Sequence, residues 1–123
     1  MSDSEKRMRE WCFYIQDMIE FGETVLSYTH ELDQDAFVTD RLTYDATLRN
    51  IQLIGEAATH IPSGVREAHP EIPWRAIVGT RNRLAHSYLT ISDDVIWTII
   101  QDAIPKLLPS LQSMLDTTEE DPE

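Results

Sequence analysis

Apolar residues recur at steps of three and four along four stretches of the chain, which is the pattern of amphipathic helices. The first stretch spans residues 5–29, the second runs from about 41 to 60, the third begins near residue 73, and the fourth begins near residue 92. Strand-type alternation of apolar and polar residues is not found in the sequence. The pattern predicts an all-α fold, an antiparallel up-down four-helix bundle with short extra helical turns.

The helix expected over residues 41–60 is apolar on two sides. One stripe contains Tyr44, Leu48, Ile51, Ile54, Ala58 and Ile61, and the second contains Leu42, Ala46, Leu53 and Ala57. A helix of this kind is either central in its bundle or also used at a contact between subunits. Gly55 lies in its middle, where glycine costs about 1 kcal/mol relative to alanine. We therefore expect another helix to approach closely at Gly55.

Several polar residues and prolines mark the expected helix boundaries. Asp40 and Ser92 stand at the positions of N-caps, where a side-chain oxygen accepts a hydrogen bond from the first turn. Pro105 and Pro109 fall inside the fourth apolar stretch and have no backbone N–H to donate. A kink or break is therefore expected near Ala103.

The length and composition fit one folded domain. The chain has 123 residues, of which 41% are hydrophobic, enough for a single core. We assign residues 1–115 to the helical bundle and residues 116–123 to an acidic, disordered tail. The acidic residues of this tail are Asp116, Glu119, Glu120, Asp121 and Glu123.

One cysteine and the absence of long apolar runs bear on the compartment. Cys12 cannot form an internal disulfide and falls on an apolar helical position, so we expect a buried structural thiol in a reducing cytosol. The sequence has neither an apolar run long enough to span a bilayer nor a start resembling a signal peptide. These features predict a cytoplasmic protein without a membrane partner.

The charge of the chain makes one segment stand out. Ten basic and 22 acidic residues give a net charge of −12 at pH 7, which repels polyanions at long range. Residues 74–88 nevertheless gather three arginines, an asparagine, a histidine and a tyrosine, in the order Trp-Arg-Ala-Ile-Val-Gly-Thr-Arg-Asn-Arg-Leu-Ala-His-Ser-Tyr. A cluster of cations in an anionic chain points to a binding or catalytic role for this segment.

Helical spacing relates the polar residues of this segment to one another. Asn82 and His86 are four residues apart and share one face of a helix. Arg81 is five residues before His86, which places it about 140° round the helix axis. Two copies that meet about a two-fold axis could set both arginines and both histidines around one cleft. The spacing therefore favours a site shared by a homodimer.

These side chains suit the cleavage of RNA without a metal ion or another cofactor. A neutral imidazole can take a proton from a ribose 2′-OH, and an imidazolium can give one to the departing 5′-oxygen. Guanidinium groups can stabilise the negative charge of a five-coordinate phosphorane. No two of the four histidines, His30, His60, His69 and His86, have zinc-ligand spacing with each other or with Cys12.

Other interpretations of the same residues remain open. An Arg-Asn-x-x-x-His run on a helix also occurs on solvated faces and in salt-bridged seams between subunits. His30, His60 and His69 lie at expected helix ends or turns, which favours capping or surface roles. Tyr88 could equally pack at the end of its helix.

The chain resembles the HepT-like HEPN family, the toxin ribonucleases of type VII-like HEPN/MNT toxin–antitoxin systems. The resemblance covers almost all of residues 5–111, and its most specific part is Arg-x4-His-x-Tyr, formed here by Arg81, His86 and Tyr88. Three further segments support it in the same order and spacing. They are Leu48-Arg49-Asn50-Ile51 with Ile54-Gly55-Glu56-Ala57, Ile72-Pro73-Trp74-Arg75 with Gly79, and Val95-Ile96-Trp97 with Pro105. Ala85 and Ser87 differ from the residues often seen beside the histidine.

The resemblance implies a function and a partner. It implies a homodimeric, metal-independent endoribonuclease in which Arg81 and His86 are catalytic and Asn82 orients the site. It also implies an MNT-type nucleotidyltransferase antitoxin, which silences the toxin by transferring AMP to Tyr88 and assembles with it, in some cases as a larger hetero-oligomer. We add Arg75 and Arg83 as candidates for binding the RNA substrate, a tRNA or an mRNA. The alternative is a non-catalytic dimeric module that docks a nucleotidyltransferase.

Overall fold

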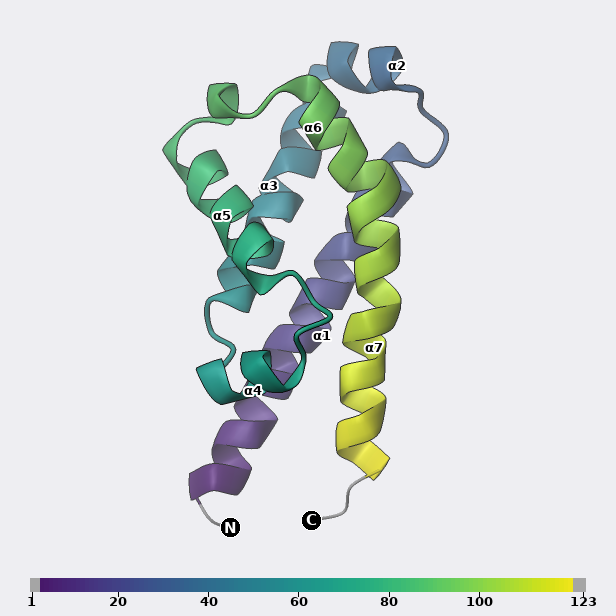
Figure 1. Cartoon of the computed structure of the whole chain (residues 1–123). Coiled ribbons are helices and arrows are strands. Elements are labelled where there is room, and N and C mark those ends of the chain that lie inside the picture. Colours follow the sequence, from purple (N-terminus) through teal and green to yellow (C-terminus); the bar gives the residue numbers. More distant parts are fainter. Residues whose placement is uncertain (1–2, 121–123) are drawn as a thin grey trace.

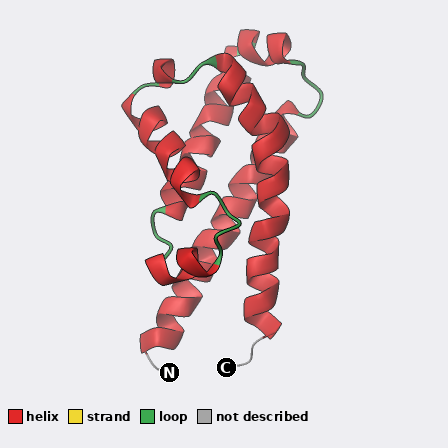
Figure 2. Ribbon diagram, in the orientation of Figure 1, coloured by secondary structure: helices red, strands yellow, loops and turns green. Residues whose placement is uncertain are grey.

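The computed structural model describes residues 3–120 of the chain, with the side chains of residues 10–118. These residues form helices and turns without a β-strand, so the predicted all-α fold is confirmed (Figures 1 and 2). The elements are α1 (Asp3–Thr29), α2 (Gln34–Thr39), α3 (Arg41–Ala58), α4 (Ser63–Ala68), α5 (Trp74–His86), the 3₁₀ turn η1 (Tyr88–Thr90), α6 (Asp93–Thr98), the π-helical turn η2 (Ile99–Ala103) and α7 (Ile104–Glu120).

The long helices run alternately up and down. Figure 1 shows α1 rising from the N-terminal end, α3 descending, α5 rising again, and the continuous α6–η2–α7 segment returning to the end where the chain began. α1 packs against both α3 and α7, whereas α5 packs mainly against α3. This is the predicted antiparallel up-down arrangement, and it leaves α5 at the edge of the bundle.

The core lies between α1, α3 and the α6–η2–α7 segment. All six residues of the first predicted apolar stripe are buried, five of them in α3 and Ile61 just beyond its end: Tyr44, Leu48, Ile51, Ile54, Ala58 and Ile61. The second stripe divides, because Ala57 is buried whereas the Leu42 side chain is 83% exposed. Phe37 lies in the short helix α2 and is fully buried.

Side-chain caps fix the starts of three helices. Asp40 Oδ1 accepts from the backbone N–H of Thr43 at 3.2 Å, and Ser92 Oγ accepts from that of Val95 at 3.2 Å, so both predicted N-caps are confirmed. Asp33 caps α2 in the same way through the N–H of Ala36 at 2.8 Å. Each cap satisfies a donor that has no partner within its helix.

The predicted break near Ala103 takes the form of a π-helical turn. In η2 the helix widens by one residue, so that the N–H of Ile104 donates to the carbonyl of Ile99. Pro105 follows directly and has no N–H to continue the ordinary pattern. The widened turn lets the α6–η2–α7 segment pass the proline without separating into two helices.

Two expectations near the termini need correction. Residues 116–120 are helical rather than disordered, because α7 continues to Glu120. Met114 and Leu115 extend its buried face, and Gln112 donates to Asp116 across one turn at 3.0 Å. The remaining predicted tail, residues 121–123, lies outside the described residues. Cys12 is half-buried rather than buried, because it sits at the edge of the apolar face of α1.

Long apolar helices of the membrane-spanning kind are not found among the described residues.

Candidate active site

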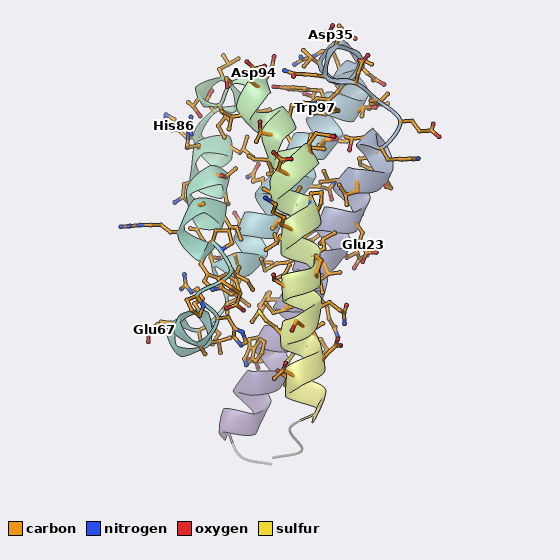
Figure 3. All side chains as sticks on the ribbon, turned by 45° about the vertical axis from the view of Figure 1, so that its right-hand side comes forward. Glu23, Asp35, Glu67, His86, Asp94 and Trp97 are labelled. Carbon is orange, nitrogen blue, oxygen red and sulfur yellow. The ribbon has the colours of Figure 1, made fainter. Side chains whose placement is uncertain are left out.

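The helix α5 presents its buried and its polar residues on opposite sides. Trp74 and Leu84 face the core and are buried. Arg75, Asn82 and His86 are exposed and recur, with Gly79, at steps of four, three and four residues. This spacing places all four on one face of the helix, which we call the outer face of α5. Figure 3 shows His86 at the end of α5, pointing away from the rest of the bundle.

Arg81 lies on the other side of α5, where this helix crosses α3. A Cβ atom built on Gly55 of α3 would clash with the Cβ of Arg81 and would lie 3.0 Å from the backbone oxygen of Ile77. Only a residue without a side chain allows the two helices to approach so closely. The close helix approach expected at Gly55 is therefore confirmed, and it places Arg81 directly over α3.

Two acceptors hold the guanidinium group of Arg81. Its Nε lies 2.6 Å from Glu56 Oε1 and its Nη2 lies 2.5 Å from the same oxygen. Its Nη1 donates to Asn82 Oδ1 at 2.8 Å. Hydrogen bonds between charged groups are stronger and more directional than neutral ones. The Arg81 side chain remains 31% exposed, so it is both oriented and open to a ligand.

Asn82 connects Arg81 to the outer face. Its carbonyl oxygen is used by Arg81, which leaves its NH₂ group as a donor toward a ligand on the outer face. His86 lies one helical turn beyond Asn82 on that face. The structure thus brings Asn82 together with Arg81 and with His86. Among the described residues of one chain, the side chains of Arg81 and His86 do not form a hydrogen bond with each other.

Arg83 contributes to a small hydrogen-bonded cluster that holds the turn after α5. Its Nη2 donates to the backbone oxygen of Thr90, and Thr90 Oγ1 donates to the backbone oxygens of Arg83 at 3.2 Å and of Ser87 at 2.7 Å. This cluster fixes η1, which carries the half-buried Tyr88. Arg83 therefore has a structural role beside the RNA-binding role predicted for it. Leu89, next to Tyr88, is 95% exposed.

The other three histidines lie away from this face. His60 stacks on Tyr14 with ring centroids 4.5 Å apart. His69 lies 3.3 Å from a carboxylate oxygen of Glu71. The exposed His30 contacts the backbone oxygen of Ser27 at 3.1 Å, at the end of α1. These positions agree with the surface and helix-end roles expected for them.

One titratable group outside the site is strongly perturbed. Burial, followed by the hydrogen bond and negative charge of Asp93, raises the pKa of Tyr44 to about 12. The Tyr44 hydroxyl donates to Asp93 Oδ1 at 2.8 Å and joins α3 to the start of α6. η1 ends three residues before Asp93, so this contact anchors the chain shortly after the turn that carries Tyr88.

Sequence reasoning missed the role of Glu56. The segment Gly55-Glu56-Ala57 contributes to the family resemblance, which assigns no function to the Glu56 carboxylate. A usable indication existed, because Glu56 follows the glycine at which another helix was expected to approach. The partner of Glu56 could not be identified without knowing which helix crosses there and in what rotation.

The fold and these residues define a class of protein. Its members are helical bundles in which an edge helix presents a fixed arginine, an asparagine and a histidine. Comparison with known sequences names the family within this class. The profile of the family described as "Ribonuclease HepT-like" matches residues 18–114, and the chain belongs to this family.

Known relatives carry ribonuclease names. A "Probable ribonuclease HepT" of Thermococcus cleftensis is 35% identical over 94 residues, which cover 76% of this chain and 86% of the relative. A protein of Methanocaldococcus jannaschii named "Putative RNase" is 32% identical over 94 residues, with the same two coverages. One of Caldanaerobacter subterraneus, also named "Putative RNase", is 29% identical over 102 residues, covering 83% of this chain and 91% of the relative. No solved structure matches the chain significantly.

Proposed function

We propose that this chain is a metal-independent endoribonuclease whose site is completed by a second copy of the chain. The observation that carries the proposal is the fixed position of Arg81, held by Glu56 and joined through Asn82 to the face that presents His86. Membership of the HepT-like ribonuclease family supports RNA as the substrate class.

The proposed reaction is an internal transesterification. His86 takes the proton of a ribose 2′-OH, and the 2′-oxygen attacks the adjacent phosphorus. The bond from phosphorus to the 5′-oxygen breaks, and an imidazolium returns a proton to that oxygen. The products are a 2′,3′-cyclic phosphate and a free 5′-OH. Arg81 stabilises the charge of the phosphorane, and Asn82 holds Arg81 and donates to a phosphate oxygen.

An apolar opening beside α5 supports a homodimer. A pocket of about 110 Å³ lies between α3, α5 and the η2–α7 segment, and its lining is almost entirely apolar. Ile99 and Ala103 belong to it and also to a shallower hollow along α6 and α7. A second copy packed over this seam would bury apolar surface. It would also bring its own α5 close to the first.

Silencing by a partner is the proposed regulation. An MNT-type nucleotidyltransferase antitoxin would transfer AMP from ATP to the hydroxyl of Tyr88, with release of pyrophosphate. The product adds bulk and negative charge two residues from His86, where an RNA phosphate would bind. The nearly complete exposure of Leu89 favours docking of a protein at this turn.

The test is RNA digestion by the purified chain in EDTA. We expect the wild type to cleave RNA and to leave cyclic phosphate ends. His86→Ala and Arg81→Ala should each lose this activity, and light scattering should show that their oligomeric state is the same as that of the wild type. His30→Ala, which changes an exposed histidine at the far end of α1, is the matched control and should cleave like the wild type. Full cleavage by His86→Ala would overturn the mechanism. Absence of cleavage by the wild type, with tight binding of a nucleotidyltransferase, would favour the non-catalytic docking module.

A further inference from the structure

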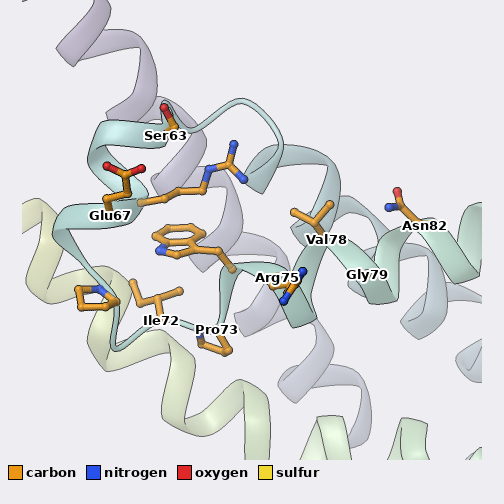
Figure 4. Close-up of a pocket in the computed structure, with 11 residues that line it drawn as sticks. Ser63, Glu67, Ile72, Pro73, Arg75, Val78, Gly79 and Asn82 are labelled. Carbon is orange, nitrogen blue, oxygen red and sulfur yellow. The ribbon is translucent and has the colours of Figure 1, made fainter.

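An open groove of about 800 Å³ lies between α4 and the first turns of α5 (Figure 4). Its floor is apolar and is lined by Pro70, Pro73 and Val78 together with Ile72 and Trp74, of which the last two are only 2% and 8% exposed. The indole Nε1 of Trp74 donates to the backbone oxygen of His69 at 3.0 Å, which fixes the ring. The rim is polar and carries the side chains of Arg66, Glu67, Arg75 and Asn82.

The groove and the proposed site are continuous along α5. Arg75, Gly79 and Asn82 line the groove and belong to the outer face that also carries His86. Asn82 is common to both, since it binds Arg81 and closes one end of the groove (Figure 4). At the rise of an α-helix, Arg75 and His86 are separated by about 16 Å along the axis. A ligand that spans this distance must be longer than one nucleotide.

The charge of the groove differs from that of the chain. Arg66 and Arg75 are opposed by Glu67 alone, so the rim has one excess positive charge in a chain of net charge −12. Arg66 Nε donates to the backbone oxygen of Ile61 at 3.0 Å, which orients the guanidinium and leaves its terminal nitrogens as donors. A pre-oriented guanidinium suits phosphate oxygens, which it can bind with two parallel hydrogen bonds.

The shape of the groove is maintained by a glycine. Gly79 lies in the middle of α5, and a Cβ atom built there would meet no other atom within 4 Å. The fold therefore does not require glycine at this position, in contrast to Gly55. A side chain at Gly79 would instead project into the groove and narrow it.

We propose that this groove binds a nucleotide beyond the two that flank the scissile phosphate in a single-stranded RNA. An apolar floor below a cationic rim matches a nucleotide, whose base is apolar on its faces and whose phosphate is anionic. The base must be unpaired to reach the floor, so the substrate is single-stranded at this point. Arg66 and Arg75 hold the phosphate of this nucleotide, and the strand continues along Asn82 to Arg81 and His86. This inference rests on the proposed ribonuclease function.

The test compares two substrates, a dinucleotide with only the scissile phosphate and an oligonucleotide that extends beyond it. Arg66→Gln and Arg75→Gln should each lower kcat/KM for the oligonucleotide roughly tenfold, since each removes a charged hydrogen bond. Both should leave the dinucleotide unchanged. Gly79→Gln should act like them by filling the groove. Arg41→Gln is the matched control, because Arg41 is also exposed but pairs with Asp45 at the opposite end of α3.

Binding provides a readout that does not depend on cleavage. In the His86→Ala background, the logarithm of the affinity for single-stranded RNA should fall with the logarithm of the salt concentration. Removing either groove arginine should reduce this slope by about 0.7. If the wild type does not cleave but the groove variants show this change, the ribonuclease proposal fails and the groove remains only as a binding site for single-stranded RNA.

Other outcomes would overturn the proposed role of the groove in binding RNA. If the wild type cleaves both substrates and the groove variants affect them equally or not at all, the groove is not a subsite and the ribonuclease proposal stands. If the variants weaken binding of a partner protein and leave RNA affinity unchanged, the groove is a protein-docking surface, and the inference is wrong.

Discussion

Gly55 and Arg81 face each other at the crossing of α3 and α5, where the space for a side chain on Gly55 is already filled by the Cβ of Arg81. The crossing does more than pack two helices. It places Arg81 over the adjacent Glu56, which binds the guanidinium, and leaves Asn82 and His86 on the outer face. The orientation of the candidate catalytic arginine therefore depends on the absence of one methyl group.

The first prediction follows from this crossing. Gly55→Ala forces α5 away from α3, so it should lower the free energy of unfolding by roughly 1–3 kcal/mol and impair RNA cleavage. Urea denaturation and the digestion assay measure the two effects. For stability the matched control is Gly79→Ala, which lies within α5 and faces open space. It should raise the free energy of unfolding by up to about 1 kcal/mol. Equal effects of the two substitutions on the free energy of unfolding would contradict the claim that the crossing of α3 and α5 requires glycine at position 55.

The second prediction concerns the residue that orients Arg81. Glu56→Gln removes the negative charge that holds the guanidinium, so kcat should fall about tenfold or more. Because the Arg81 and Glu56 side chains are 31% and 37% exposed, stability should change by less than about 1 kcal/mol. Glu56→Asp should recover part of kcat. Asp45→Asn, which breaks the exposed pair with Arg41, is the control and should leave kcat unaltered. A loss of kcat that only parallels unfolding would show that Glu56 merely stabilises the fold.

Much of the frame could be predicted because its causes are local. The caps at Asp40 and Ser92 involve backbone groups only three residues away, and the apolar steps of α3 identify its buried face without reference to other helices. The outer face of α5 follows from spacing in the same way. The up-down topology requires only short connections between long helices. These features need no knowledge of how the helices are rotated against one another.

The remaining features depend on that rotation. Glu56 and Arg81 are 25 residues apart, and Tyr44 and Asp93 are 49 apart. Neither pair has a periodic pattern that would link its members before the helices are docked. The groove beside α4 arises from the path of residues 69–73, which periodicity does not describe. The helical part of the expected tail was missed because its acidic residues outweighed Met114 and Leu115, which are buried against the core.

The third prediction concerns a polar atom in the core. Thr47 is fully buried, and its Oγ1 has no hydrogen-bond partner in the described part of the chain. Burying an unpaired hydroxyl is unfavourable, so Thr47→Val should raise the free energy of unfolding by about 1 kcal/mol. The matched control is Thr29→Val, because Thr29 is equally buried but donates to the backbone oxygen of Val25 at 2.8 Å. Chemical denaturation of both variants decides the matter, and a larger gain for Thr29→Val would count against the reasoning.

The fourth prediction uses the hydrogen bond between Tyr44 and Asp93. Because the pKa of Tyr44 is raised from 10.0 to about 12 in the folded chain, the unfolded chain loses the phenol proton first as the pH rises. The folded state then binds more protons, so the contribution of Tyr44 to stability is complete below pH 10 and is lost between about pH 10 and 12. Tyr44→Phe should lower the free energy of unfolding by about 1 kcal/mol at pH 8.

Tyr44→Phe should also lose less stability than the wild type as the pH rises above 10. Urea denaturation from pH 8 upward should show the wild type and Tyr44→Phe converging as the pH passes 10, because the wild type loses an interaction that the variant never had. Tyr28→Phe alters a tyrosine that is 45% exposed and should keep the profile of the wild type. A constant difference between wild type and Tyr44→Phe across this range would mean that the phenol proton is held no more tightly after folding. The bond to Asp93 would then join α3 to α6 without any linkage to pH.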